Sequence, residues 1–134
     1  MKEPLSVAIL DLDHFKNVND IYGHQVGDLV LKRFAAVLKS NLRSMDIAGR
    51  WGGEEFVVLL PATTVGEAMR VLDRIRITIS QESFPAPVES LKVCLSTGLT
   101  EFDREIMDPE EIVGIANKGL YDAKESGRNR ICIT

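Results

Sequence analysis

The stretch RWGGEEFVVLL, residues 50–60, contains two adjacent glycines directly before two glutamates and an apolar run. Gly52 and Gly53 stand between DIAGRW and EEFVVLL, and we expect each of these runs to form a strand. Paired glycines supply the positive backbone angles that a tight hairpin requires. The pattern therefore predicts two antiparallel strands that meet at a two-residue glycine turn.

Strands and helices alternate along the rest of the chain. Short apolar runs predict strands at residues 5–12, 91–100 and 130–133. Apolar side chains at three- and four-residue steps predict helices at residues 26–42, 64–79 and 109–127. The order β-α-β-β-α-β-α-β predicts an α/β fold of the α+β kind, with a palm-like, five-stranded, mainly antiparallel sheet flanked by helices.

Two of these helices begin with recognisable capping signals. Thr64 and Glu67 have the spacing of a capping box. Asp108 is followed by Pro109 and Glu111, which combines a cap, a first-turn proline and a box partner. Both helix starts are therefore predicted from the sequence.

Composition limits the class of protein. The 134 residues are 45% hydrophobic, enough for one domain with a core, and we expect residues 1–134 to form that single domain. No apolar run approaches the roughly 20 residues of a membrane span, so we expect no membrane contact from this chain, although a membrane-anchored parent protein stays open. Cys94 and Cys132 are expected to be reduced thiols in the cytoplasm.

The charge balance bears on possible ligands. The chain has 20 acidic and 16 basic residues and a net charge of -4, which argues against a broad nucleic-acid surface. We expect no nucleic-acid partner. A phosphate ligand would therefore need a metal ion or a local basic cluster.

Two acids are expected to meet at the hairpin. In a two-residue turn at Gly52 and Gly53, Trp51 faces Glu54, and Glu54 and Glu55 point to opposite faces because side chains alternate along a strand. If the strand at residues 5–12 lies beside this hairpin, Asp11 approaches Glu54. Magnesium prefers oxygen ligands and leaves positions for water or phosphate. This arrangement predicts a nucleoside triphosphate site, although solvated acids at strand ends are the alternative.

Three motifs identify a family. DLDHFKNVNDIYGHQVGD, residues 11–28, packs varied polar groups between a strand and a helix, more than a structural loop needs. With RWGGEEF and LYDAKESGRNR, it resembles the GGDEF family of bacterial diguanylate cyclases, which condense two GTP into cyclic di-GMP. The resemblance covers nearly the whole chain and implies the palm-like nucleotidyl-cyclase fold. It also implies a homodimer for catalysis, because each domain binds one GTP.

The resemblance implies a role for each matching residue near the metal. Asp11 and Glu54, with the backbone carbonyl of Leu12, would hold Mg²⁺ or Mn²⁺. Glu54 would also help to deprotonate the attacking ribose 3′-hydroxyl. Lys16 would contact phosphate as pyrophosphate leaves; the alternative is a surface lysine. Glu55 is expected to face elsewhere and play a supporting role.

Other matching positions would bind the nucleotide. Asn19 and Asp28 would read guanine through its purine edge; the alternatives are a turn residue and a charge in the first helical turn. His24 would contact the nucleotide, or bond to the backbone of a loop. Phe15 is either a neighbour of the site or part of the core.

Cations at the end of the last helix would bind phosphates. Lys124 and Arg128 match family positions that hold the β- and γ-phosphates. Cations near a helix C-terminus also offset the helix dipole, and the two roles are compatible.

The string RSMD resembles the family's inhibitory RxxD site for the product. Arg43 and Asp46 would bind cyclic di-GMP, with Arg74 as an additional arginine. A salt bridge at a helix end is the alternative.

Compared with the family pattern, we expect residues 1–134 to lack the helix that precedes the first strand, with its LTGLxNR-like segment. The leading interpretation is a magnesium-dependent cyclase that acts on GTP. The alternatives are a catalytically silent module that binds GTP or cyclic di-GMP and signals through attached domains, and a structural or protein-interaction domain.

Overall fold

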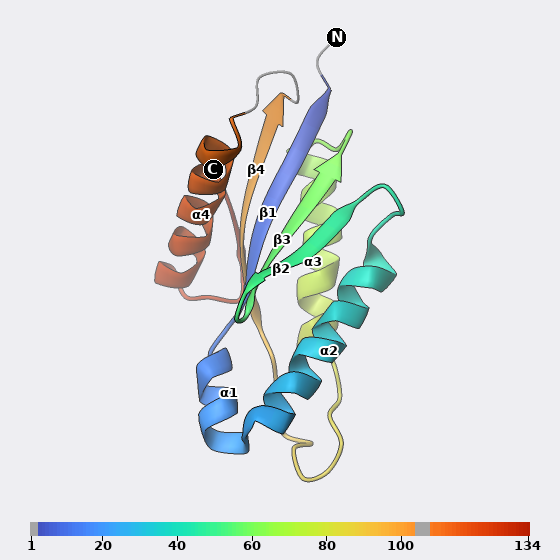
Figure 1. Cartoon of the computed structure of the whole chain (residues 1–134), viewed down its shortest axis with the longest axis vertical. Coiled ribbons are helices and arrows are strands. Elements are labelled where there is room, and N and C mark those ends of the chain that lie inside the picture. Colours follow the sequence, from blue (N-terminus) through green and yellow to red (C-terminus); the bar gives the residue numbers. More distant parts are fainter. Residues whose placement is uncertain (1–2, 104–107) are drawn as a thin grey trace.

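The computed structural model describes residues 3–103 and 108–134, which form five strands and four helices. In chain order they are β1 (Pro4–Leu12), α1 (Phe15–Tyr22), α2 (His24–Asn41), β2 (Ile47–Gly52), β3 (Glu55–Pro61), α3 (Val65–Ser80), β4 (Leu95–Asp103), α4 (Pro109–Glu125) and β5 (Ile131–Ile133). The strands form one sheet in the order β2-β3-β1-β4-β5 (Figure 1). The predicted five-stranded sheet is confirmed.

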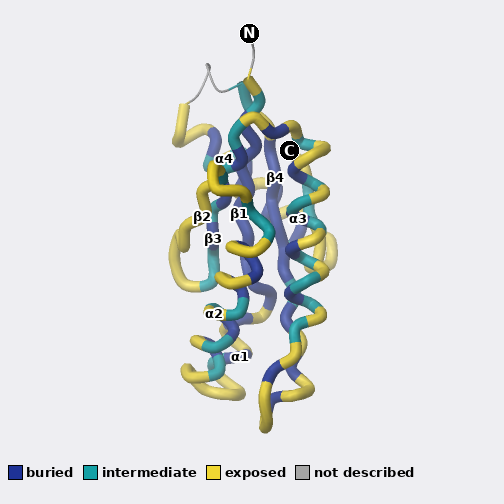
Figure 2. The backbone as a smooth tube through the Cα atoms, turned by 90° about the vertical axis from the view of Figure 1, so that its right-hand side faces the viewer, coloured by how far each residue is buried: buried dark blue, intermediate teal, exposed yellow. Residues whose placement is uncertain are grey.

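The strand β1 is the centre of the sheet. It pairs antiparallel with β3 on one side and with β4 on the other, whereas β5 pairs parallel with β4. The sheet is therefore mainly antiparallel, as the order of elements predicts. Most of β1 is buried, and Figure 2 shows it in dark blue together with much of β4.

Helices cover the two faces of the sheet unequally. On one face, α2 and α3 pack against side chains such as Leu10 and Val58. On the other face, α4 packs on Leu5, Val7 and Ile9 through a smaller cluster. Figure 1 shows α4 on the opposite side of the sheet from α2 and α3. None of the helices in the described part of the chain is long and apolar enough to cross a membrane.

The hairpin differs from its predicted geometry. Gly52 pairs with Glu55, and the register shifts between Arg50 and Gly52, so a bulge takes Trp51 out of the pairing. The prediction that Trp51 faces Glu54 was wrong. The turn consists of Gly53, with φ of 49°, and Glu54 itself. Glu54 thus lies at the tip of the hairpin, immediately before the first residue of β3.

The segment after β1 is helical, although the sequence suggested a polar loop. In α1 only Phe15 and Val18 are buried, so its apolar stripe is too short to show a helical period in the sequence. A helix break at Gly23, with φ of 91°, separates α1 from α2. The polar residues of this segment therefore stand on a rigid element.

Other boundaries follow the sequence more closely. The capping box of Thr64 and Glu67 is present, and the side chain of Asp108 accepts a hydrogen bond from the Glu110 N–H. The strand predicted at residues 91–100 begins later, at Leu95, and runs to Asp103. The two helix starts are confirmed, but Asp108 bonds the N–H of Glu110 rather than that of Glu111, the predicted box partner. The predicted start of the strand was four residues too early.

Candidate active site

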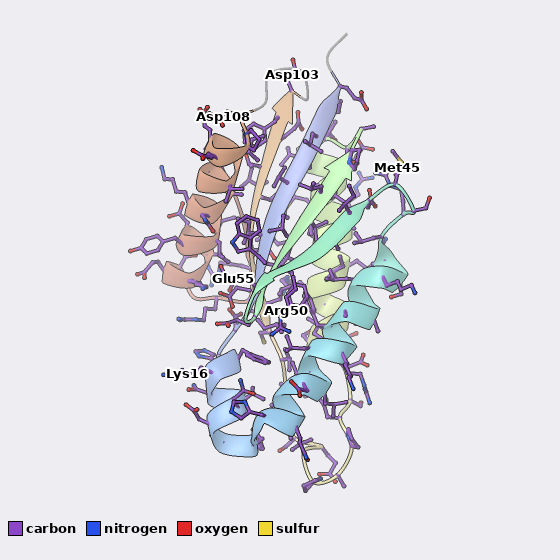
Figure 3. The ribbon with its side chains drawn as sticks, in the orientation of Figure 1. Lys16, Met45, Arg50, Glu55, Asp103 and Asp108 are labelled. Carbon is purple, nitrogen blue, oxygen red and sulfur yellow. The ribbon has the colours of Figure 1, made fainter. Side chains whose placement is uncertain are left out.

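Four parts of the chain meet at the hairpin end of the sheet and line a cavity of about 210 Å³. It is lined by Asp11, Leu12, Asp13, His14, Phe15, Lys16, Asn17, Glu54, Lys124 and Arg128. The residues predicted to bind metal and phosphate therefore lie together, although they come from β1, α1, the β2–β3 turn and the end of α4. Figure 3 shows Arg50 and Glu55 at the hairpin, near the end of α1 that carries Lys16.

Asp11 is the buried acid of this cavity. Its side chain is 6% exposed, and Oδ2 accepts a hydrogen bond from Nζ of Lys124 at 2.5 Å. Burial raises the pKa of Asp11 from 3.8 to about 6. Lys124 opposes this rise, whereas the negative charges of Glu54 and Glu55 add to it. The site thus holds an acid that a cation stabilises in its charged form.

The two glutamates lie on the same side as Asp11. Asp11 and Glu55 are directly paired between β1 and β3, so their side chains project from the same face of the sheet. The Leu12 N–H donates to the carbonyl of Glu54 at 3.3 Å, which ties the hairpin tip to the end of β1. The expectation that Glu55 faces away from this site was wrong, because Glu54 occupies the turn and the alternation begins only at Glu55.

The donor groups fit a divalent cation that also binds substrate. Among the described residues, no group of three or more His, Cys, Asp or Glu side chains is placed to hold a metal. Magnesium is commonly bound by one or two carboxylates and completes its coordination with water and substrate phosphates. Asp11 and Glu54 supply such a pair, and the ammonium of Lys124 now occupies the cationic position beside Asp11. The chemistry of the site therefore suits Mg²⁺ or Mn²⁺.

The residues predicted to bind guanine lie beside this cavity and do not line it. Asn19 is half-buried on α1, whereas His24 and Asp28 are exposed on α2. The side chain of Asn19 packs against Gly27, where an added Cβ would lie 1.9 Å from Asn19 Oδ1. The glycine thus makes room for Asn19 next to Asp28.

Phe15 belongs to the core as well as to the cavity wall. It is 8% exposed, packs in the main hydrophobic cluster and lines the cavity. Its ring also approaches Gly27, since an added Cβ there would lie 3.3 Å from Phe15 Cζ. Phe15 therefore links the cavity to the Asn19 region by packing.

The RxxD residues form a second group, away from the hairpin. Arg43 Nη2 pairs with Asp46 Oδ1 at 2.9 Å and donates to Thr63 Oγ1 at 2.7 Å. Arg74 Nε donates to Asn41 Oδ1 at 2.7 Å. Arg43, Asp46 and Arg74 together line a cavity of about 200 Å³. The structure thus contains the salt bridge and also brings the three predicted residues together.

A larger cavity lies between α2 and β2. Its volume is about 550 Å³, and Arg43 and Asp46 line it as well, together with Arg50 and Phe56. It contains none of the residues predicted for metal or phosphate binding. The assignment of the nucleotide site therefore rests on the chemistry of the smaller cavity rather than on size.

Sequence reasoning assigned no role to Asp13. This residue is 9% exposed and bonds Ser96 and Asn129, which are far apart in the sequence. The signal that was available is its position, two residues after Asp11 and directly after the buried strand β1. Its partners become visible only when the chain is folded.

Comparison with known proteins gives the family. Residues 1–130 match the family described as diguanylate cyclase, GGDEF domain. Diguanylate cyclase A of Treponema denticola is 41% identical over 133 residues, which make up 99% of this chain and 36% of that protein. The chain therefore spans well under half of this curated relative.

Two solved structures are similar throughout. The GGDEF domain of DgcB from Caulobacter crescentus, in complex with c-di-GMP, has a TM-score of 0.90 at 30% identity and covers 98% of this chain and 78% of that one. The active GGEEF domain of a diguanylate cyclase from Vibrio cholerae has a TM-score of 0.90 at 34% identity, with 98% and 83% covered. Sequence, fold and family match agree over nearly the full length, and this chain belongs to the GGDEF family of diguanylate cyclases.

Proposed function

We propose that residues 1–134 form one cyclase domain that condenses two GTP molecules into cyclic di-GMP and releases pyrophosphate. The observation that carries this proposal is the buried Asp11, which lies beside Glu54 and pairs with Lys124 in one cavity. A relative whose solved domain has the same GGEEF motif is described as active, and another was solved with c-di-GMP. These relatives support the reaction class.

Phosphate binding falls to three cations that line the cavity. Lys16 stands at the start of α1, Lys124 stands in the last turn of α4, and Arg128 follows in the turn after α4. Lysine supplies a compact charge, and arginine supplies a planar fork that matches phosphate oxygens. We propose that Lys124 leaves Asp11 for the phosphates when nucleotide binds. These cations then stabilise the charge that develops as pyrophosphate leaves.

Asp11, Glu54 and the carbonyl of Leu12 would hold the divalent cation, Mg²⁺ or Mn²⁺. When bound, such a cation neutralises phosphate charge and lowers the pKa of coordinated oxygens. Glu54 accepts the proton of the attacking ribose 3′-hydroxyl. Its place at the tip of the hairpin leaves its side chain half-buried rather than packed in the core, which suits a group that must meet substrate.

Guanine recognition is proposed for Asn19 and Asp28, with His24 and Phe15 beside them. An amide and a carboxylate can together accept from and donate to the purine edge. Asn19 is held against Gly27, so its amide is already restricted before nucleotide binds. This restriction favours recognition because less side-chain freedom is lost on binding.

Each domain binds one GTP, and the product has two-fold symmetry. We therefore propose that two chains face each other, each presenting its 3′-hydroxyl to the α-phosphate held by its partner. Catalysis then requires a homodimer. The reaction rate is expected to rise with the square of chain concentration where the dimer is scarce.

Product inhibition is proposed for Arg43, Asp46 and Arg74. Arg43 is 51% exposed at its side chain, so its guanidinium can exchange protein partners for a phosphate or base edge. Calorimetry with cyclic di-GMP tests this site. We expect binding to the unmodified chain and loss of both binding and inhibition in Arg43→Ala; an absence of binding to the unmodified chain would refute the inhibitory role.

The catalytic proposal is tested by incubating the chain with GTP and Mg²⁺ and separating the products by chromatography. We expect cyclic di-GMP and pyrophosphate from the unmodified chain and none from Glu54→Gln. Glu89→Gln is the matched control, because Glu89 is exposed and outside the cavity, and it should leave turnover unchanged. GTP binding without product at high chain concentration would favour the silent binding module instead.

A further inference from the structure

The turn after α4 fixes the backbone of Arg128 and leaves its side chain free. The Arg128 N–H donates to the Ala123 carbonyl at 2.9 Å, and the Arg128 carbonyl accepts from Nε of Arg130 at 3.0 Å. The φ of Arg128 is 63°, in the left-handed region that residues other than glycine seldom adopt. With the residues that the structure describes, the exposed guanidinium forms no hydrogen bond or ion pair. The turn thus presents the guanidinium for a ligand.

Asp13 ties the next residue of this turn to the sheet. Its Oδ1 accepts from the Ser96 hydroxyl at 2.6 Å, and its Oδ2 accepts from the Asn129 N–H at 3.0 Å. The Asp13 N–H donates to the Cys94 carbonyl at 2.9 Å, so the residue directly after β1 is bonded to the residue directly before β4. A buried carboxylate forms stronger hydrogen bonds than a neutral acceptor. Asp13 therefore sets the position of the turn relative to the cavity.

A second anchor reaches the same turn from α3. Arg76 Nη1 donates to Asn129 Oδ1 at 3.1 Å, and Arg76 Nη2 pairs with Asp73 Oδ1 at 2.8 Å. Asn129 also has a positive φ, 48°, a conformation in which asparagine is enriched. The backbone N–H and the side chain of Asn129 are thus held from two different elements. A turn held in this way has little freedom to move the residue before it.

We propose that Asp13 is a positioning residue, which fixes Arg128 for contact with nucleotide phosphates, and that Arg76 is its second anchor. The inference rests on the proposed function, because it assigns Arg128 to the phosphates of GTP. Asp13 acts through Arg128, since both of its carboxylate oxygens already have protein partners. Loss of this tether weakens phosphate binding and leaves guanine recognition on α1 and α2 intact.

The test compares the affinities of the 134-residue chain for GTP and for GMP, measured by calorimetry with Mg²⁺. Asp13→Asn keeps the shape of the side chain but replaces one acceptor oxygen with an NH₂ donor. We expect its affinity for GTP to fall about tenfold or more, the usual loss for one charge-assisted hydrogen bond. Its affinity for GMP should stay unchanged. Adding Asp13→Asn to Arg128→Ala should weaken GTP binding no further than Arg128→Ala alone.

Ser6→Ala is the matched control for the loss of a buried hydrogen bond. Ser6 Oγ donates to the Thr63 carbonyl at 2.8 Å, near the other end of β1. This variant should lower the Tm and keep the preference for GTP over GMP. If Asp13→Asn does not fold, Arg76→Ala tests the second anchor by the same comparison of the affinities for GTP and GMP.

The outcomes separate the inference from the function on which it rests. If the unmodified chain prefers GTP over GMP, and Asp13→Asn (or Arg76→Ala in its place) folds and keeps the full preference, the inference is overturned and the proposed function stands. If the unmodified chain binds neither nucleotide, or binds both equally, the proposed function is overturned and the inference with it. The inference is also overturned if Asp13→Asn loses the preference for GTP over GMP but Arg128→Ala keeps it.

Discussion

Replacing Asp11 with asparagine removes a buried acid whose ionisation works against folding. Burial raises the pKa of Asp11 to about 6 from its usual 3.8. At a pH between these two values, the Asp11 carboxyl therefore holds a proton in the folded chain and has lost it in the unfolded chain. Between these two pH values the folded state binds more protons, and its stability falls as the pH rises. The asparagine variant lacks this titration. The difference in stability between the two chains should therefore depend on pH in this window.

The size of the effect follows from the shift. A rise from 3.8 to about 6 corresponds to about 3 kcal/mol of stability, lost in full above pH 6. Between pH 4.5 and pH 7 the same two pKa values give a change of about 2 kcal/mol. The side chain of Lys124 is 34% exposed and can stay hydrated in the variant, so its loss of a partner should add only a constant offset over this range.

Urea unfolding of both chains at several pH values measures this change without nucleotide or metal. We expect Asp11→Asn to gain about 2 kcal/mol relative to the unmodified chain between pH 4.5 and pH 7. In a chain that keeps Asp11, Lys124→Met should enlarge the loss of stability between pH 4.5 and pH 7, because Lys124 lowers the pKa of Asp11. Parallel stability profiles for Asp11→Asn and the unmodified chain would show that Asp11 is not a perturbed acid and would refute this reasoning.

Three further substitutions test the packing around the site and the frame that carries it. Gly27→Ala displaces the Asn19 side chain and should raise the KM for GTP about tenfold. Gly114→Ala on α4 is the control: its added Cβ meets nothing within 4 Å, so the KM should stay unchanged. Equal KM values for the two variants would contradict the role of Asn19. Gly98→Ala places a Cβ 2.1 Å from the Ala116 carbonyl oxygen. Urea unfolding should show that the free energy of unfolding falls by about 3 kcal/mol. A fall of less than about 1 kcal/mol would argue against this close approach of β4 and α4. Thr64→Ala removes the capping box of α3 and should cost about 1 kcal/mol in the same assay, and an unchanged stability would show that the cap contributes little.

Local sequence patterns predicted most of the fold. The helix starts at Thr64 and Asp108 were correct because a cap acts within four residues and leaves its signal in the sequence. The hairpin was predicted, but its turn is one residue further along, since a bulge at Trp51 depends on how β2 twists against β3. A bulge is a tertiary feature, and a pair of glycines does not specify it.

The site was predicted only in part, because some of its contacts join residues that are distant in the sequence. Asp11 and Glu54 were expected to meet because antiparallel pairing of a strand with a hairpin brings their ends together, and this placement is confirmed. The chemical roles assigned to them stay predictions. Asp13 was missed because its partners, Ser96 and Asn129, are separated from it by 83 and 116 positions, and only the folded sheet brings them close.

The most direct measurement is a crystal structure of the chain with Mn²⁺ and 3′-deoxy-GTP, which lacks the attacking hydroxyl. The anomalous signal of manganese locates the metal independently of the nucleotide. We predict a manganese peak beside Asp11 and Glu54, with Lys124 and Arg128 on the phosphates and Asn19 on guanine. Nucleotide in the cavity of about 550 Å³ between α2 and β2, or a manganese peak away from Asp11, would contradict the proposed site.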